Sequence, residues 1–373
     1  MKRLLTIMTS IALTFALSIS AAFATDDSLV RAQKAAKMLT LDSPDAVIGY
    51  EASGLEADGL ANDLLENFKD VDYNTASYGD LTKSIIAISL LGDNPADFNK
   101  TNLVQILENR VNEDGTLVND ENGGCGATIW TLMALETVDS SKTQAVAKKL
   151  STMALDNGAY WYYYNGQTAD LDTTAWAMEA LTIAGRSTYD AAISKAYSYV
   201  QSQLDENYAY NSGWGGNADT QACVIEGLTV AGYKYDEAAY NNLLSYQNAD
   251  GTFTGWDGKP NNYTLAEFTR SLGTINNGSF ILKAKKDYQK TLNASQPEQP
   301  SKPDTKPDTT TPEVKPGKDT TTSTTTTTKP SKKDTTTKKD VVNTGDDTNI
   351  MAYVIVAIAA VGVITLTLKS RKQ

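Results

Sequence analysis

The chain has 373 residues, carries a formal net charge of −12 and contains no histidine. This acidity excludes nucleic acid as a partner, because phosphate binding needs a basic face. The missing histidine excludes Ser-His-Asp catalysis and histidine-ligated zinc, and the two cysteines, Cys125 and Cys223, are too few for a disulfide scaffold.

The first 24 residues have the pattern of a secretory signal peptide. Lys2 and Arg3 precede an apolar run, and residues 22–24 supply the small residues that a signal peptidase accepts. Cleavage there would leave Thr25 as the first residue, whereas an uncleaved apolar run would be a membrane anchor. The small-residue site followed by Asp26 and Asp27 favours removal, so we expect an exported protein.

Residues 25–292 repeat with a period close to 46. One marker is a threonine near the start of an apolar segment, at Thr82, Thr128, Thr174, Thr220 and Thr264. A second marker is a glycine or aspartate that ends an apolar segment, at Gly54, Gly92, Asp139, Gly185, Gly232 and Gly273. Two markers that keep one period predict a repeat architecture.

Each repeat predicts a pair of helices. Residues 190–204 show the i, i+3, i+4, i+7 stripe of an amphipathic helix, whereas residues 171–184 are apolar nearly all round and must be buried on most sides. Six such pairs favour an all-α fold in which the apolar helices form the inner of two concentric rings, an α/α toroid. An open α-solenoid is the alternative.

Two segments show a resemblance to a known family. Residues 243–253 (LLSYQNADGTF) and 215–222 (GGNADTQA) resemble the repeat of the terpenoid cyclase and prenyltransferase toroids. The chain is most similar to bacterial surface proteins with prenyltransferase/squalene-oxidase repeats, over residues 28–292. The resemblance implies the toroid fold, but this fold hosts many functions, so it does not select one.

One segment resembles a catalytic motif of this superfamily. Squalene-hopene-type cyclases protonate an alkene with an aspartate of a DxDD motif, and Asp170-Leu171-Asp172-Thr173 matches it except at the last position. The resemblance implies Asp172, with Asp170, as the catalytic acid. The alternative is that these residues cap a helix N-terminus. A glycosidase would need a second carboxyl, for which Asp219, Glu179 and Glu226 are the candidates.

Two further chemistries of the superfamily are excluded by single residues. Protein prenyltransferases bind zinc through Asp, Cys and His, and the chain has no histidine. Complement-like thioester domains need a GCGEQ motif, whereas Gly124–Thr128 (GCGAT) has threonine in place of glutamine. Cys125 is therefore expected to be a small buried residue. We expect no metal and no cofactor.

Aromatic residues gather in the segments that lead into the expected inner helices. Rings mixed with Asn, Gly and Asp suit a ligand of sugar or cofactor size, although they can equally pack the turns. By resemblance to transcobalamin-like toroids, the ligand could be a corrinoid. The candidate ligand-binding residues are Trp161, Tyr162, Tyr164, Tyr210, Trp214, Trp256 and Tyr263.

Residues 293–340 are rich in Thr, Pro, Lys and Asp and have almost no apolar side chains. Such a segment cannot bury enough surface to offset its ordering entropy, so we expect a disordered stalk. The composition favours a spacer over a binding element.

Residues 341–373 have the order of a Gram-positive sorting signal. Val341–Gly345 (VVNTG) precedes an apolar stretch over 351–368, about long enough to cross a membrane, and a short basic tail follows. It resembles an LPXTG signal with two valines in place of Leu and Pro. The resemblance implies a sortase that cuts between Thr344 and Gly345 and joins the chain to peptidoglycan, whereas a plain membrane anchor is the alternative.

Two functions remain open from the sequence. The first is a surface-anchored, non-catalytic protein that binds a small molecule or a glycan at the aromatic end of the toroid. The second is an envelope enzyme of the terpenoid cyclase-like or glycan-active class, with Asp172 as general acid. The absent histidine and the absent fourth aspartate favour the first.

Overall fold

The computed structural model describes residues 27–57, 59–120, 123–162, 167–211, 215–255 and 257–295. All of them belong to one compact unit, residues 1–301. The expected signal peptide, the sorting signal with Thr344, Gly345 and the apolar stretch over 351–368, and the stalk from residue 296 onward lie outside the described residues. Within those ranges no helix combines the length and apolarity that a membrane crossing requires.

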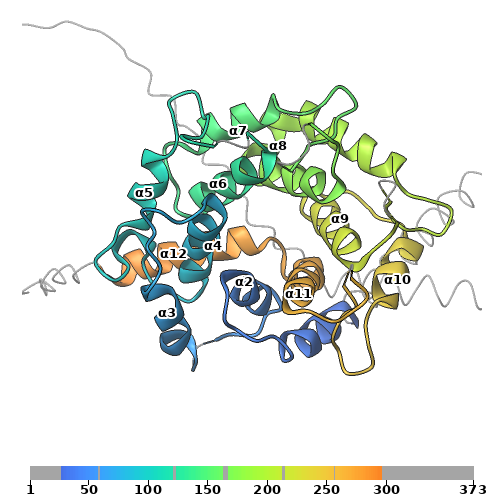
Figure 1. Cartoon of the computed structure of the whole chain (residues 1–373), viewed down its shortest axis with the longest axis horizontal. Helices are drawn as coiled ribbons and strands as arrows, with labels where there is room; N and C mark the ends of the chain where they lie inside the picture. Colours follow the sequence, from blue (N-terminus) through green and yellow to red (C-terminus); the bar gives the residue numbers. More distant parts are fainter. Residues whose placement is uncertain are drawn as a thin grey trace, which may run out of the picture. The chain divides into compact units, whose positions relative to one another are not determined.

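The centre of the described unit is a closed ring of helices. Each helix packs against the next, and the last packs against the first (Figure 1). The chain thus forms an α/α toroid and not an open solenoid. The ring comprises α2 (Pro44–Ala52), α4 (Tyr78–Leu90), α6 (Cys125–Thr137), the first part of α8 (Leu171–Ser202), α9 (Ala218–Val230) and α11 (Asn262–Asn277).

A second set of helices surrounds this ring. Helix α8 leaves helical geometry at Gly185, where φ is 150°, and its second part belongs to the outer set. The outer helices bury one face, as α3 does with Leu64, Leu65 and Phe68. The other outer elements are residues 27–36, α3 (Ala61–Lys69), α5 (Leu103–Asn109) after the short 3₁₀ turn η1 (Pro95–Asp97), α7 (Thr143–Ser151) and α10 (Glu237–Ser245).

Contacts between the first and the last repeat close the outer ring. Arg31 Nη1 donates to Gln247 Oε1 at 2.9 Å, and Lys34 Nζ donates to the Ala249 carbonyl at 2.6 Å. Gly251 has a φ of +103°, and a Cβ there would lie 3.0 Å from Lys34 Cγ. Glycine is therefore required both for the turn and for the close approach of the helix over residues 27–36.

The inner helices begin at defined caps. In α2, α4, α8, α9 and α11 the N-cap side chain accepts a hydrogen bond from the backbone N–H three residues later, which satisfies a donor that the helix leaves open. These N-caps are Ser43, Ser77, Asp170, Asn217 and Asn261, and α6 begins at Gly124 without a side-chain cap.

Helix α12 (Phe280–Ala294) lies outside the pattern of helix pairs, although we expected the repeat to extend to residue 292. It packs against the ring helices at the end where they terminate. Lys283 Nζ lies 2.9 Å from Glu51 Oε2 in the last turn of α2, and Lys285 Nζ lies 2.9 Å from Glu136 Oε1 in the last turn of α6. Helix α12 therefore covers this end of the ring.

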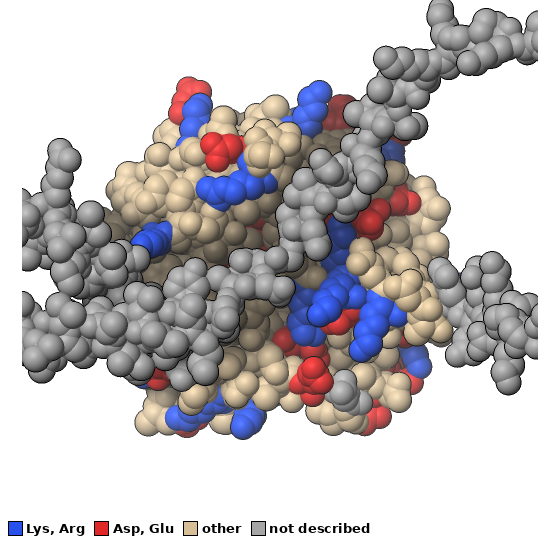
Figure 2. All heavy atoms as spheres, turned by 180° about the vertical axis from the view of Figure 1, so that it is seen from behind, with Lys and Arg blue, Asp and Glu red and all other residues tan. Residues whose placement is uncertain are grey.

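The stripe of Phe280, Ile281, Ala284 and Tyr288 on α12 is buried. The spacing of these residues is that of an amphipathic helix. Figure 2 shows the molecule from behind, where Lys and Arg side chains are interleaved with Asp and Glu side chains on the surface.

Candidate functional site

One stripe of each inner helix faces the axis of the ring. Residues two, six and nine positions after the N-cap lie on one side of a helix, because these steps approximate whole turns. Contacts between neighbouring helices join residues of equal depth: the ring centroids of Trp130 and Trp176 are 5.8 Å apart, and Cys223 Sγ lies 3.8 Å from Glu267 Oε2. The inner helices therefore run parallel, and their N-termini share one end, the mouth of the ring.

We call the residues of these stripes the axial column. The first layer, at the mouth, contains Asp45, Gly79, Gly126, Asp172, Asp219 and Tyr263. The second layer contains Gly49, Lys83, Trp130, Trp176, Cys223 and Glu267, and the third contains Ala52, Ile86, Met133, Glu179, Glu226 and Arg270.

The structure separates the two aspartates of the DxDD-like segment. Asp170 is the N-cap of α8, and its Oδ1 accepts from the Thr173 backbone N–H at 2.8 Å. Asp172 is half-buried in the first layer and accepts a hydrogen bond from the Thr220 hydroxyl, whereas its Oδ1 is buried without a partner. Burial, followed by the nearby charges of Asp170 and Glu267, raises the pKa of Asp172 well above its usual range.

The second layer contains a cation in an aromatic setting. Lys83 Nζ lies 2.7 Å from Asp45 Oδ1, 4.7 Å from the Trp130 ring centroid and 5.9 Å from that of Tyr263. In the same layer, burial raises the pKa of Glu267 to about 7 against the lowering effects of Arg270, of the Tyr263 hydrogen bond and of Lys83. Sequence reasoning missed both Lys83 and Glu267, although their equal distance from the N-caps was a signal in the repeat.

The third layer contains a buried ion pair and an isolated carboxyl. Arg270 Nε lies 2.9 Å from Glu226 Oε1, and both side chains are fully buried. Glu179 has no exposed surface, and neither of its carboxyl oxygens has a hydrogen-bond partner. Burial, with the charge of Glu226 as the second cause, raises the pKa of Glu179 well above its usual range.

The expected aromatic residues fall into separate groups. Tyr162 and Tyr263 lie at the mouth: a Cβ on Gly126 would be 2.5 Å from Tyr162 Cε2, and Tyr263 is 47% exposed. Tyr210 is fully buried, with its backbone bonded in both directions to the Gln221 side chain, so its ring packs the core and offers no surface to a ligand. Tyr164, Trp214 and Trp256 lie outside the described residues.

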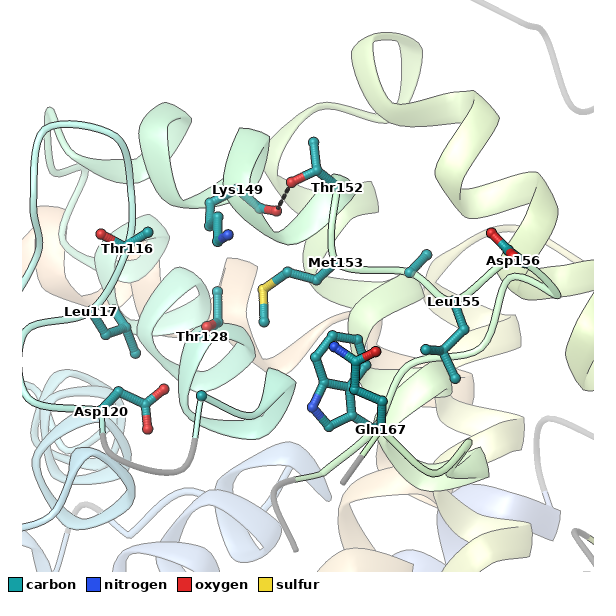
Figure 3. A pocket seen from close by; sticks show the side chains of 13 residues that line it. Thr116, Leu117, Asp120, Thr128, Lys149, Thr152, Met153, Leu155, Asp156 and Gln167 are labelled. Atoms are coloured by element: carbon teal, nitrogen blue, oxygen red, sulfur yellow. Dashed lines mark hydrogen bonds between the residues drawn. The ribbon is translucent and has the colours of Figure 1, made fainter. Parts of the chain in front are cut away.

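Trp161 borders a cavity of about 670 Å³. Its backbone carbonyl accepts from the Cys125 N–H at 3.0 Å, which fixes it beside the start of α6, and it keeps 8% of its surface exposed. Figure 3 shows Lys149, Met153, Thr128 and Gln167 around the cavity. The lining also includes Thr116, Leu117, Asp120, Thr152, Leu155 and Asp156.

The cysteines are not placed for chemistry. Both Cys125 and Cys223 are unbridged and fully buried, and burial raises the pKa of the Cys125 thiol to about 12. A thiol that stays protonated is a poor nucleophile. Across the described residues, no group of three or more Cys, Asp or Glu side chains is arranged to hold a metal ion.

Comparison with known proteins reveals similarity in the fold alone. No family model and no curated protein matches the chain. Among solved structures, the apo type II terpene cyclase MstE from Scytonema superposes with a TM-score of 0.50 at 14% sequence identity, over 67% of this chain and 98% of that one. The fold is terpene cyclase-like. At this identity the likeness carries no substrate and no catalytic residue to the chain.

Proposed function

We propose that the chain is a surface-anchored, non-catalytic binding protein that takes a saccharide into the cavity beside Trp161. The observation that carries the proposal is the composition of this cavity, in which an indole ring lies among Lys149, Gln167 and Thr128. A sugar presents a flat apolar face edged by hydroxyl groups, and such a ligand needs one aromatic surface with a few convergent polar groups.

The proposed location at the cell surface rests on the two ends of the sequence. The signal peptide over residues 1–24 and the sorting signal around Thr344 and Gly345 predict export and attachment by a sortase to peptidoglycan. The Thr-rich stalk would hold the toroid away from the attachment point. A protein attached to peptidoglycan would be surrounded by glycans, which favours a glycan as its ligand.

We expect the full-length protein to bind an oligosaccharide in titration calorimetry with chitotetraose, cellotetraose and maltotetraose as probes. Lys149→Gln should weaken the binding about tenfold, because it removes a charged hydrogen-bond donor from the cavity. Lys148→Gln is the matched control, since Lys148 is exposed on the same helix and does not line the cavity. Gln167→Ala should weaken binding about fivefold.

Equal losses in the Lys149 and Lys148 variants would point to general electrostatics and contradict this site. The proposal would also fail if none of the three tetrasaccharides released heat at millimolar concentration. Thermal unfolding of each variant separates lost binding from lost folding. Trp161 is avoided as the primary variant, because truncating a nearly buried tryptophan costs about 3–5 kcal/mol of stability.

A second function is favoured by the state of Asp172. A half-buried carboxyl with raised pKa, a free Oδ1 and a place at the mouth of the ring has the properties of a general acid. In this case the chain would protonate an alkene or a glycosidic oxygen. The missing histidine and the absence of an acid at Thr173 make this the second choice.

Asp172→Asn distinguishes this second function. If the chain is an enzyme, this variant should lose at least about 100-fold in product formation from squalene, geranylgeranyl diphosphate or a chromogenic glycoside. Asp170→Asn is the matched control, because asparagine caps a helix as well as aspartate does and removes the same charge. Turnover that survives in Asp172→Asn would rule out Asp172 as the acid.

A further inference from the structure

The axial column contains more carboxyl groups than cations. Its carboxyls are Asp45, Asp172, Glu179, Asp219, Glu226 and Glu267, and its cations are Lys83 and Arg270. Lys83 pairs with Asp45 and Arg270 pairs with Glu226. In the described part of the chain, no Lys or Arg nitrogen lies within 4.0 Å of Asp172 or Glu179.

The state of Glu179 indicates that the column binds a ligand. It is fully buried on the stripe of α8 that faces the axis, and both of its oxygens lack partners. A carboxyl in this position is costly to keep without a partner, because it has lost its water and gained no hydrogen bond. Trp176, directly above Glu179 on the same stripe, gives this part of the column an aromatic wall.

The column already shows how it holds an ammonium group. The Lys83 ammonium lies between the Asp45 carboxylate and the faces of Trp130 and Tyr263. A carboxylate beside aromatic faces is the arrangement that recognises alkylammonium ions. A carboxyl and an aromatic ring occur together again as Asp172 and Trp176 on α8, with Glu267 of α11 near Asp172. Among the described residues, Asp172 forms no ion pair with a Lys or Arg side chain.

The geometry is less suited to a metal ion than to an organic cation. A hard cation such as Ca²⁺ needs six or more oxygen ligands at about 2.3–2.6 Å. Among the described residues no three acidic or cysteine side chains converge in this way. Indole and phenol rings contribute nothing to such a shell, whereas they bind an ammonium through its C–H and N–H surface.

We propose that the mouth of the ring binds an organic ammonium ion, with Asp172 and Glu267 as its carboxylate partners and Trp176 and Tyr263 as its aromatic walls. The site is independent of the saccharide cavity, which lies beside α6 and α7. Glu179 is the deeper carboxyl that a second ammonium of a diamine would reach. Because burial raises the pKa of these carboxyls, forming an ion pair with a bound ammonium should be accompanied by proton release.

The proton release gives the site a defined pH dependence. A carboxyl with a raised pKa is neutral at low pH and ionises as the pH rises, so the affinity for a cation should rise with pH. The groups that act on Glu267 are Asp172 on α8, Asp219 and Cys223 on α9, Lys83 on α4, and Tyr263 and Arg270 on its own helix. Behind them, Glu226 pairs with Arg270 and Asp45 acts on Tyr263.

Titration calorimetry of the full-length chain with putrescine and tetramethylammonium chloride tests the site. We expect one bound amine per chain and an affinity about tenfold higher at pH 8 than at pH 6, because the pKa of Glu267 lies near 7. Measurements at pH 6 in two buffers of different ionisation enthalpy should detect the released proton. Asp172→Asn should weaken binding at least tenfold, and Glu179→Gln should weaken putrescine more than tetramethylammonium.

Asp236→Asn is the control, and its affinity should stay within twofold of the parent, because asparagine keeps the N-cap of the outer helix α10 and leaves the charges of the column unchanged. Lys149→Gln should leave amine binding unchanged, so the failure of one site does not imply failure of the other. The proposal is overturned if neither amine binds at pH 8, if calcium chloride binds in their place, or if Asp236→Asn and Asp172→Asn have the same effect.

Discussion

Replacing Arg270 by methionine is expected to lower the free energy of unfolding by about 3–5 kcal/mol. The guanidinium is fully buried, pairs with Glu226 and also lowers the pKa of Glu267. Its removal leaves two buried carboxyls without their compensating charge, and an unpaired buried charge costs much more than an exposed one. Urea denaturation monitored by circular dichroism measures the change.

The control for this variant is an exposed ion pair. Lys69 Nζ lies beside Glu66 on α3, with side chains 38% and 65% exposed, and Lys69→Met should change stability by less than about 1 kcal/mol. The double variant Glu226→Leu/Arg270→Met should recover part of the loss, since apolar residues often replace a buried pair without cost. Equal stability of the Arg270 and Lys69 variants would contradict the buried position of Arg270.

The second large effect is expected for Gly273→Ala on α11. A Cβ at this position would lie 2.2 Å from the Ala52 carbonyl oxygen of α2 and 2.5 Å from its carbon. Both atoms belong to the backbone, so the two helices would have to move apart at the place where the ring closes. We expect a loss near the upper end of the ~1–3 kcal/mol that overpacking typically costs, measured by urea denaturation.

Gly79→Ala on α4 provides a control with the opposite sign. This glycine is also helical, but a Cβ there would meet only the Ser77 Oγ at 3.7 Å. Alanine should therefore raise stability by roughly 0.5–1 kcal/mol through its higher helix propensity. A gain at both positions would mean that helix propensity and not close packing governs Gly273. An equal loss at both would mean that the loss at Gly273 does not come from its contact with Ala52.

The alternation of helices in the ring could be predicted because it follows from a repeated pattern. The period of the threonines and glycines, together with the contrast between residues 171–184 and 190–204, is sufficient for six helix pairs. Helix α12 could not be placed in the same way, because it occurs once. Its apolar stripe indicates that it packs on something, but only the structure shows that it packs across the end of the ring.

The candidate site was harder to predict, because two residues that are two positions apart on a helix point to different sides of that helix. Asp170 and Asp172 look equivalent in the DxDD-like segment, yet the first caps the helix and the second faces the axis. Tyr210 and Tyr162 both precede an inner helix, but the first is in the core and the second lies near the mouth. Local sequence does not specify these directions.

The saccharide cavity could not be predicted from the sequence for a different reason. Lys149 comes from an outer helix, Thr128 from an inner one and Gln167 from the segment before α8. Their meeting depends on how three elements pack, and no spacing in the chain encodes it. Trp161 was identified as a candidate because it is aromatic and lies close to the start of an inner helix, which is a coarser signal.

The contact of Lys34 with Ala249 has a consequence for how the protein folds. Neighbours in the ring that are separated by more than 200 residues in the sequence can meet only after the intervening repeats are in place. An open array could gain or lose a repeat at its end and remain folded. In the closed ring, the removal of any helix pair would leave two helix pairs without a neighbour. Folding should therefore be slow and all-or-none. For the same reason, evolution cannot readily change the number of repeats.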